Sequence, residues 1–124
     1  MPKKILVVDD EKDVIYILED ALKKEGYDIE SASDGVEALE KVSRFMPDLI
    51  ILDIMMPKLD GHSVNLKLKE STATAKIPVI FITAYGQLKE LLDTREEFPV
   101  AGYIEKPFPV STIIGKVKEL LGDK

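Results

Sequence analysis

The sequence lacks cysteine and tryptophan, and it contains a single histidine. The absence of cysteine excludes disulfides, thiolate chemistry and cysteine-based zinc sites. One histidine alone argues against a metal site built from imidazoles. No apolar run approaches the roughly 20 residues that cross a membrane. The apolar run near the N-terminus is too short for a signal peptide and ends in acidic residues. We therefore expect a cytoplasmic protein without a membrane partner.

The chain also lacks an excess of basic residues. It has 17 Lys and Arg against 23 Asp and Glu, which gives a net charge of −6. Direct binding to nucleic acid would require the opposite balance. Its 124 residues suffice for one domain with a full core, and no repeat or linker divides them. We expect one domain over residues 1–124, with no effector domain.

Five short apolar segments of strand type alternate with segments of helical spacing. The strands are predicted at residues 4–8, 27–32, 48–52, 78–83 and 101–105. A first helix follows the first strand and stops at Gly26. Its apolar residues are Val14, Ile17, Leu18, Ala21 and Leu22.

Two further helices carry clear end signals. Asp34 and Glu37 form an N-terminal capping pattern, with a predicted apolar stripe of Val36, Leu39 and Val42. Pro109 opens the last helix and Gly122 closes it. The apolar face of that helix comprises Val110, Ile113, Ile114, Val117, Leu120 and Leu121.

The segment after Gly61 is ambiguous, because Val64, Leu66 and Leu68 alternate with polar residues as they would in a strand. We predict a helix there, since a buried parallel strand must be followed by a crossover. Leu88, Leu91 and Leu92 indicate a fourth helix. Gly61 is expected to adopt a φ angle that other residues avoid.

Strict alternation of strands and helices predicts an α/β fold, in which a doubly wound, five-stranded parallel sheet carries helices on both faces. In such sheets, function gathers at the carboxyl ends of the strands. Asp9 and Asp10 end the first strand, Asp53 the third, Thr83 the fourth and Lys106 the fifth. These five side chains are therefore expected to share one edge of the sheet.

Three adjacent carboxylates would repel one another and raise at least one pKa. A hard divalent cation removes that penalty, and Mg²⁺ prefers carboxylate, water and phosphate oxygens. With Lys106 nearby, the site would attract a phosphoryl group while holding a carboxylate nucleophile. Taken singly, Asp10 could merely cap the first helix and Lys106 could be a surface charge. Their joint placement favours phosphoryl transfer onto an aspartate.

Four segments carry a family resemblance: "ILVVDDE", "DLIILDIMMPKLDG", "IPVIFITA" and "YIEKPF". In this order and spacing they resemble the receiver domain of two-component response regulators, the CheY-like superfamily. The resemblance implies a flavodoxin-like (βα)5 fold with strand order 2-1-3-4-5. It also implies that Asp53 accepts a phosphoryl group from a histidine kinase.

The resemblance further implies the metal ligands. Asp10 and Asp53 would bind Mg²⁺ directly, with Mn²⁺ as a possible substitute. Asp9 would act indirectly, through water or by orientation. Met55 would supply its backbone carbonyl, while Glu11 would only start the first helix.

The same resemblance assigns the groups around the phosphoryl oxygens. Thr83 would donate its hydroxyl to one oxygen and Lys106 would pair with another, with a cis bond between Lys106 and Pro107. Tyr103 lies where the family has an aromatic switch, which would turn inward after phosphorylation and alter the surface of the fourth helix, fifth strand and fifth helix.

The implied partners are a sensor histidine kinase or phosphotransfer protein, a small phosphodonor, and an unidentified downstream protein. The chain would be a monomer or a weak dimer. It would not be an enzyme in the usual sense, because Asp53 is itself the substrate. Where the family has Gly-Ala before the fifth strand, this chain has Pro99-Val100.

Other functions remain as alternatives. A phosphorylation-independent adaptor of receiver type would lack the acids or the lysine, which are all present here. An aspartyl-phosphate phosphatase similar to the haloacid dehalogenases would have a second acid at the position of Met55 and room for a cap domain. A flavodoxin-like cofactor binder would need a phosphate-binding loop in place of Asp9, Asp10 and Glu11.

Overall fold

The computed structural model describes residues 2–54, 60–84 and 101–122. Five parallel strands form one sheet in the order β2-β1-β3-β4-β5, which confirms the predicted fold class and strand order. The strands are β1 (Lys4–Val8), β2 (Asp28–Ala32), β3 (Leu49–Asp53), β4 (Val79–Thr83) and β5 (Gly102–Glu105). The helices of the described residues are α1 (Lys12–Lys24), α2 (Gly35–Phe45), α3 (Gly61–Glu70) and α5 (Val110–Leu121). The helix predicted around residues 88–92 and the Pro99-Val100 pair lie outside the described residues.

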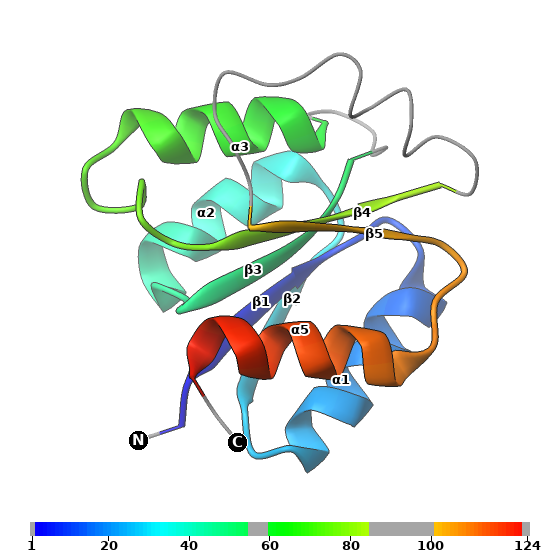
Figure 1. Cartoon of the computed structure of the whole chain (residues 1–124). Helices are drawn as coiled ribbons and strands as arrows, with labels where there is room; N and C mark the ends of the chain where they lie inside the picture. The colour runs from blue at the N-terminus through cyan, green and yellow to red at the C-terminus, as the bar shows by residue number, and fades with distance from the viewer. Residues whose placement is uncertain (1, 55–59, 85–100, 123–124) are drawn as a thin grey trace.

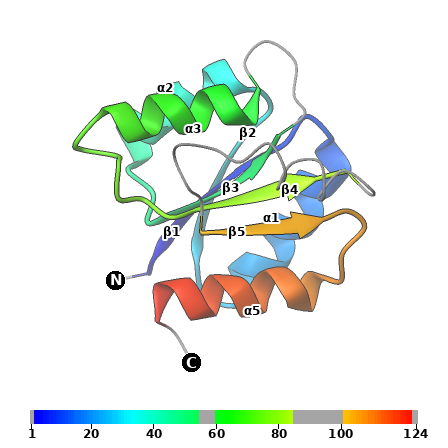
Figure 2. The same ribbon diagram turned by 45° about the horizontal axis from the view of Figure 1, so that its top comes forward.

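The helices cover the sheet in two layers. Helices α2 and α3 lie on one face and α1 and α5 on the other (Figure 1), and the tilted view separates the layers (Figure 2). Along β1, Ile5 and Val7 pack toward α1 and α5, whereas Leu6 and Val8 pack toward α2 and α3. Burial on both faces explains why this strand is a continuous apolar run in the sequence. Within the described parts of the chain, no helix is both long and apolar enough to cross a membrane.

The strand bounds differ slightly from the prediction. Strands β2, β3, β4 and β5 each begin one residue later than predicted. Strand β3 also continues for one more residue, because Asp53 pairs with Ile82 in the parallel ladder. The backbone of Asp53 is therefore fixed within the sheet rather than in the loop that follows.

The predicted helix ends are confirmed. Gly26 follows α1 with φ +95°, and Gly122 ends α5 with φ +75°, a region that glycine enters without steric cost. At the start of α2, Asp34 Oδ1 accepts a hydrogen bond of 2.8 Å from the Glu37 amide. The helical assignment of α3, which rested on topology alone, is also confirmed.

Some predicted helix faces are wrong in detail. On α2 the buried residues are Gly35, Ala38 and Val42, whereas Val36 is 50% exposed. The spacing 35–38–42 fits a helical stripe as well as the one predicted, and packing on the sheet selects it. On α1, Ile17 is 49% exposed although it was predicted to face the core.

Gly61 is required for a reason other than the one predicted. Its φ angle is not in the left-handed region, so backbone freedom does not explain the residue. A Cβ atom at this position would lie 2.7 Å from the carbonyl oxygen of Asp53 and 2.7 Å from the Cα of Ile54. Gly61 therefore allows the start of α3 to approach the backbone at the end of β3.

This contact predicts a contrast between two glycine substitutions. Gly61→Ala should lower the free energy of unfolding by about 1–3 kcal/mol, because neither backbone can move aside easily. Gly115→Ala is the matched control, since a Cβ on this α5 residue would meet nothing within 4 Å. It should raise the free energy of unfolding by about 0.5–1 kcal/mol. Urea unfolding followed by circular dichroism measures both; equal effects would contradict the close approach.

Candidate functional site

Three carboxylates gather at the carboxyl ends of β1 and β3. Oxygens of Asp9, Asp10 and Asp53 all lie within 4.8 Å of one another. Asp9 and Asp10 directly follow β1, and Asp53 is the last residue of the neighbouring strand β3. The strands reach this edge at the right of Figure 1. The predicted convergence of the three acids is thus present in the structure.

Asp9 is the most deeply buried of these acids. Its side chain is fully buried, and its Oδ1 accepts a hydrogen bond of 2.9 Å from the Glu11 amide. Its Oδ2 forms an ion pair of 3.1 Å with Lys106 Nζ but has no well-aligned hydrogen bond from the residues that the structure describes. Burial raises the pKa of Asp9 to about 7; the nearby charge of Asp53 adds to this shift, while the Glu11 amide and Lys106 oppose it.

Lys106 provides the positive charge at this edge of the sheet. Its Nζ lies 2.6 Å from Glu11 Oε1, 3.1 Å from Asp9 Oδ2 and 3.3 Å from Asp53 Oδ2. Burial disfavours the charged ammonium, but the close contacts with Glu11 and Asp9 and the charges of Asp9 and Asp53 raise its pKa overall. The Lys106 amide donates to the Thr83 carbonyl at 2.8 Å. The Lys106–Pro107 bond is cis, as predicted.

The contact between Glu11 and Lys106 was not predicted from the sequence. Glu11 was assigned only to the start of the first helix, and it is the N-cap residue of α1. Ninety-five positions separate Glu11 from Lys106, so no local pattern links them. The signal that could have revealed the pair is topological, since Glu11 follows β1 at the edge of the sheet where Lys106 follows β5.

The donor set fits Mg²⁺. The site offers only oxygen ligands, and among the described residues the buried Asp9 Oδ2 has an ion pair with Lys106 but no well-aligned hydrogen bond. Asp10 is exposed, which leaves one side of the cluster open to water or to a phosphate oxygen. Lys106 is one ammonium beside four carboxylates, those of Asp9, Asp10, Glu11 and Asp53. Met55, the predicted carbonyl ligand, lies outside the described residues.

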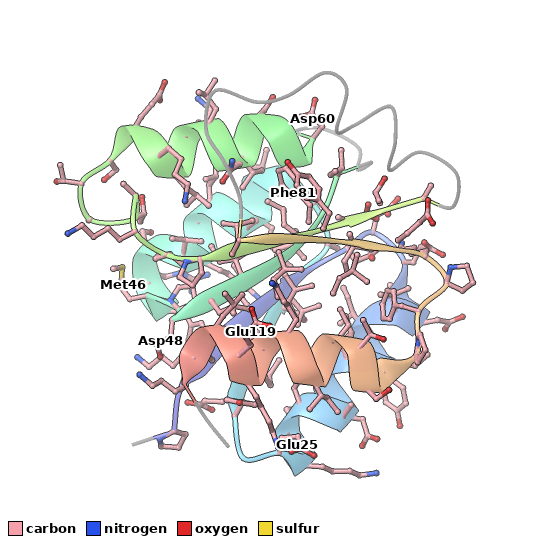
Figure 3. All side chains as sticks on the ribbon, viewed as in Figure 1. Glu25, Met46, Asp48, Asp60, Phe81 and Glu119 are labelled. Carbon is pink, nitrogen blue, oxygen red and sulfur yellow. The ribbon has the colours of Figure 1, made fainter. Side chains whose placement is uncertain are left out.

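Thr83 and Tyr103 lie on the side of the site away from Asp9. Thr83 is buried at the end of β4, next to β3. Phe81 is two residues earlier, so the two side chains share one face of the sheet. Phe81 points from β4 toward the layer of α3 (Figure 3), and its ring meets the Tyr103 ring edge-on at a centroid distance of 5.8 Å. Tyr103 is half-buried. Thr83, Phe81 and Tyr103 therefore form a row on one face of the sheet, in which the rings of Phe81 and Tyr103 are in contact.

Comparison with known proteins identifies the fold and the family. The family model of the response regulator receiver domain matches residues 5–118. The alkaline phosphatase synthesis transcriptional regulatory protein PhoP of Bacillus subtilis is 40% identical over 122 residues, which is 98% of this chain and 49% of that protein. The chain thus spans about half the length of this curated relative.

Two solved structures are similar throughout. The crystal structure of a putative response regulator from Chloroflexus aurantiacus has a TM-score of 0.90 at 30% identity, covering 98% of this chain and 99% of that one. The receiver domain of a sensor histidine kinase from Pseudomonas aeruginosa has a TM-score of 0.85 at 25% identity, covering 99% of this chain and 100% of that one. That structure has a magnesium ion coordinated in its active-site cleft.

The acidic cluster predicts that Mg²⁺ stabilises the folded protein. A ligand that binds only the folded state should stabilise it by about 2.7 kcal/mol at a concentration one hundred times its dissociation constant. Asp10→Asn should remove most of the resulting rise in melting temperature, because it removes one charge and one ligand from the cluster. Asp13→Asn, which removes an exposed acid on the first turn of α1, is the control and should retain the rise. Thermal unfolding with Mg²⁺ and with EDTA measures the effect, and an equal loss in both variants would argue against the site.

Proposed function

The chain belongs to the response regulator receiver domain family, and on that premise we propose that Asp53 is its phosphoacceptor. The observation that carries the proposal is the position of Asp53 within the cluster. It ends β3, which lies between the strand that leads to Asp9 and Asp10 and the strand that ends at Thr83. A phosphoryl group on Asp53 would therefore have Asp9 and Asp10 on one side and Thr83 on the other, with the Lys106 ammonium close to both Asp53 and Asp9.

The other two acids are less suited to this role. Asp9 is fully buried and its Oδ1 is held by the Glu11 amide. Asp10 is exposed, whereas Asp53 is only 4% exposed and has Lys106 Nζ 3.3 Å from its Oδ2. A nucleophile beside a cation and largely shielded from water favours attack on a dianionic phosphoryl group, for which positioning and charge neutralisation are the main requirements.

In the proposed reaction a carboxylate oxygen of Asp53 attacks the phosphorus of phosphohistidine. The new bond joins that oxygen to phosphorus, and the phosphorus–nitrogen bond breaks. Its electron pair stays with the imidazole, which leaves as a neutral ring because its other nitrogen carries a proton. With acetyl phosphate as donor, acetate leaves with the electron pair instead. The product is an acyl phosphate on Asp53.

We assign Asp10, Asp53 and the Met55 carbonyl as direct ligands of Mg²⁺, with Asp9 as an indirect one. Bound there, the ion would neutralise the carboxylates and the phosphoryl oxygens that approach them. Lys106 would transfer hydrogen bonds from the carboxylates to a phosphoryl oxygen. The Thr83 hydroxyl would donate to another, because Thr83 ends the strand beside β3.

The row from Thr83 through Phe81 to Tyr103 provides a path for the signal. Movement of Thr83 toward a phosphoryl group would change the packing against Phe81, whose ring contacts that of Tyr103. Tyr103 would then turn inward and alter the surface around β5 and α5. The net charge of −6 favours a protein, rather than nucleic acid, as the partner that reads this surface. The proposed donor is a histidine kinase or phosphotransfer protein.

Phosphorylation of Asp53 is tested by intact mass. Incubation with acetyl phosphate and Mg²⁺ should add one phosphoryl group that alkaline pH removes, because acyl phosphates are labile to base. Asp53→Asn should abolish this adduct, since an amide is a poor nucleophile. Asp48→Asn is the matched control: Asp48 lies just before the other end of β3 (Figure 3), and its variant should be modified like the unsubstituted protein. An equal adduct on Asp53→Asn, or no adduct on the unsubstituted protein, would refute the proposal.

A further inference from the structure

Glu11 occupies a helix-capping position without acting as a cap. It is the N-cap residue of α1, where Ser, Thr, Asp and Asn are preferred because their short side chains accept a hydrogen bond from the first turn. Its side chain makes no such bond to any residue that the structure describes. The carboxylate instead contacts Lys106 Nζ at 2.6 Å, a shorter distance than either other carboxylate partner of Lys106.

Glu11 also stands apart from the acidic cluster. Among the described residues, the group that could hold a metal ion comprises Asp9, Asp10 and Asp53, without Glu11. The main chain nevertheless fixes Glu11 beside the cluster, because its amide donates to Asp9 Oδ1. The position of Glu11 is therefore set by the site, while its carboxylate is directed to Lys106.

We propose that Glu11 is a positioning residue that restrains Lys106 before phosphorylation and releases it when a phosphoryl group arrives. This inference rests on the proposed phosphorylation of Asp53. Lys106 Nζ donates hydrogen bonds to Glu11 and Asp53 and forms an ion pair with Asp9. A phosphoryl oxygen would compete with these three carboxylates for the same ammonium.

Glu11 is the partner that Lys106 can give up at the lowest cost. The Glu11 side chain is 60% exposed, so water can solvate its carboxylate after the pair separates. Asp9 is fully buried and Asp53 is only 4% exposed, so neither carboxylate would gain much solvation from bulk water if it were separated from Lys106. Lys106 therefore exchanges Glu11 for the phosphoryl oxygen, and the strength of the Glu11 contact opposes phosphoryl binding.

The effect of Glu11 is measured as the dissociation constant of beryllofluoride in the presence of saturating Mg²⁺. Beryllofluoride is a non-hydrolysable analogue that binds as a phosphoryl group would. Glu11→Gln should lower the dissociation constant about two- to fivefold, the range expected for loss of an exposed ion pair. Glu11→Asp keeps the charge but shortens the side chain, and an aspartate at this position can accept from the first turn of α1 instead. It should also tighten binding. Isothermal titration calorimetry gives the constants.

Two controls separate the contact from general effects. Asp13→Asn removes one negative charge near the site without touching Lys106, since its acid lies on the exposed first turn of α1. Glu25→Gln breaks a second Glu–Lys pair of 2.6 Å, with Lys118, just past the far end of α1 (Figure 3). Both variants should bind beryllofluoride as the unsubstituted protein does.

Each outcome decides the question. If both Glu11 variants bind beryllofluoride more tightly and neither control does, the result supports the restraint of Lys106 by Glu11. Unchanged or weaker binding in the Glu11 variants overturns it, and so does an equal gain in Asp13→Asn, because charge alone would then explain the effect. If the unsubstituted protein fails to bind beryllofluoride, the phosphoacceptor proposal itself fails. Normal binding with no effect of Glu11 refutes only the restraint.

Discussion

The repulsion among three carboxylates is the constraint on which the rest of the site depends. Oxygens of Asp9, Asp10 and Asp53 lie within 4.8 Å of one another, and two of these side chains are almost completely removed from water. Such an arrangement is unfavourable in isolation. Lys106 offsets part of the repulsion by contacting two of the three, and it reaches Glu11 as well. The remaining negative charge makes this edge of the sheet suited to a divalent cation, which is the basis of the proposed phosphoryl transfer.

The sheet keeps these groups in place. Strands β1, β3 and β4 are buried on both faces between the layers of α1 with α5 and α2 with α3. Pairing of Asp53 with Ile82 extends the ladder to the proposed phosphoacceptor, and the close approach at Gly61 restrains the backbone that follows. Rigidity matters because groups held in place need no reorganisation when charge moves. The same sheet carries Phe81 and Tyr103, whose rings are in contact on the face that Thr83 shares with Phe81.

Much of this arrangement could be predicted from the sequence, because parallel strands place their carboxyl ends together. The strands, the fold class and the helical nature of residues 61–70 followed from alternation and from the need for a crossover. Side-chain detail did not follow. Two helical stripes fit α2, and only packing selects Ala38 over Val36. Gly61 indicated a position that only glycine could occupy. The sequence could not show whether the reason was an unusual φ angle or the close approach of another part of the backbone. The Glu11–Lys106 pair joins distant residues and depends on how far each side chain reaches.

The central claim is that Asp53, among the three acids of one cluster, receives the phosphoryl group. Its most direct test is borohydride reduction of the phosphorylated protein, followed by peptide mapping with mass spectrometry. Borohydride converts an aspartyl phosphate to homoserine and leaves free aspartate unchanged, so the product marks the acceptor position. Homoserine is expected at position 53 alone. Homoserine at position 9 or 10, or its absence from all three positions after exposure to acetyl phosphate and Mg²⁺, would contradict it.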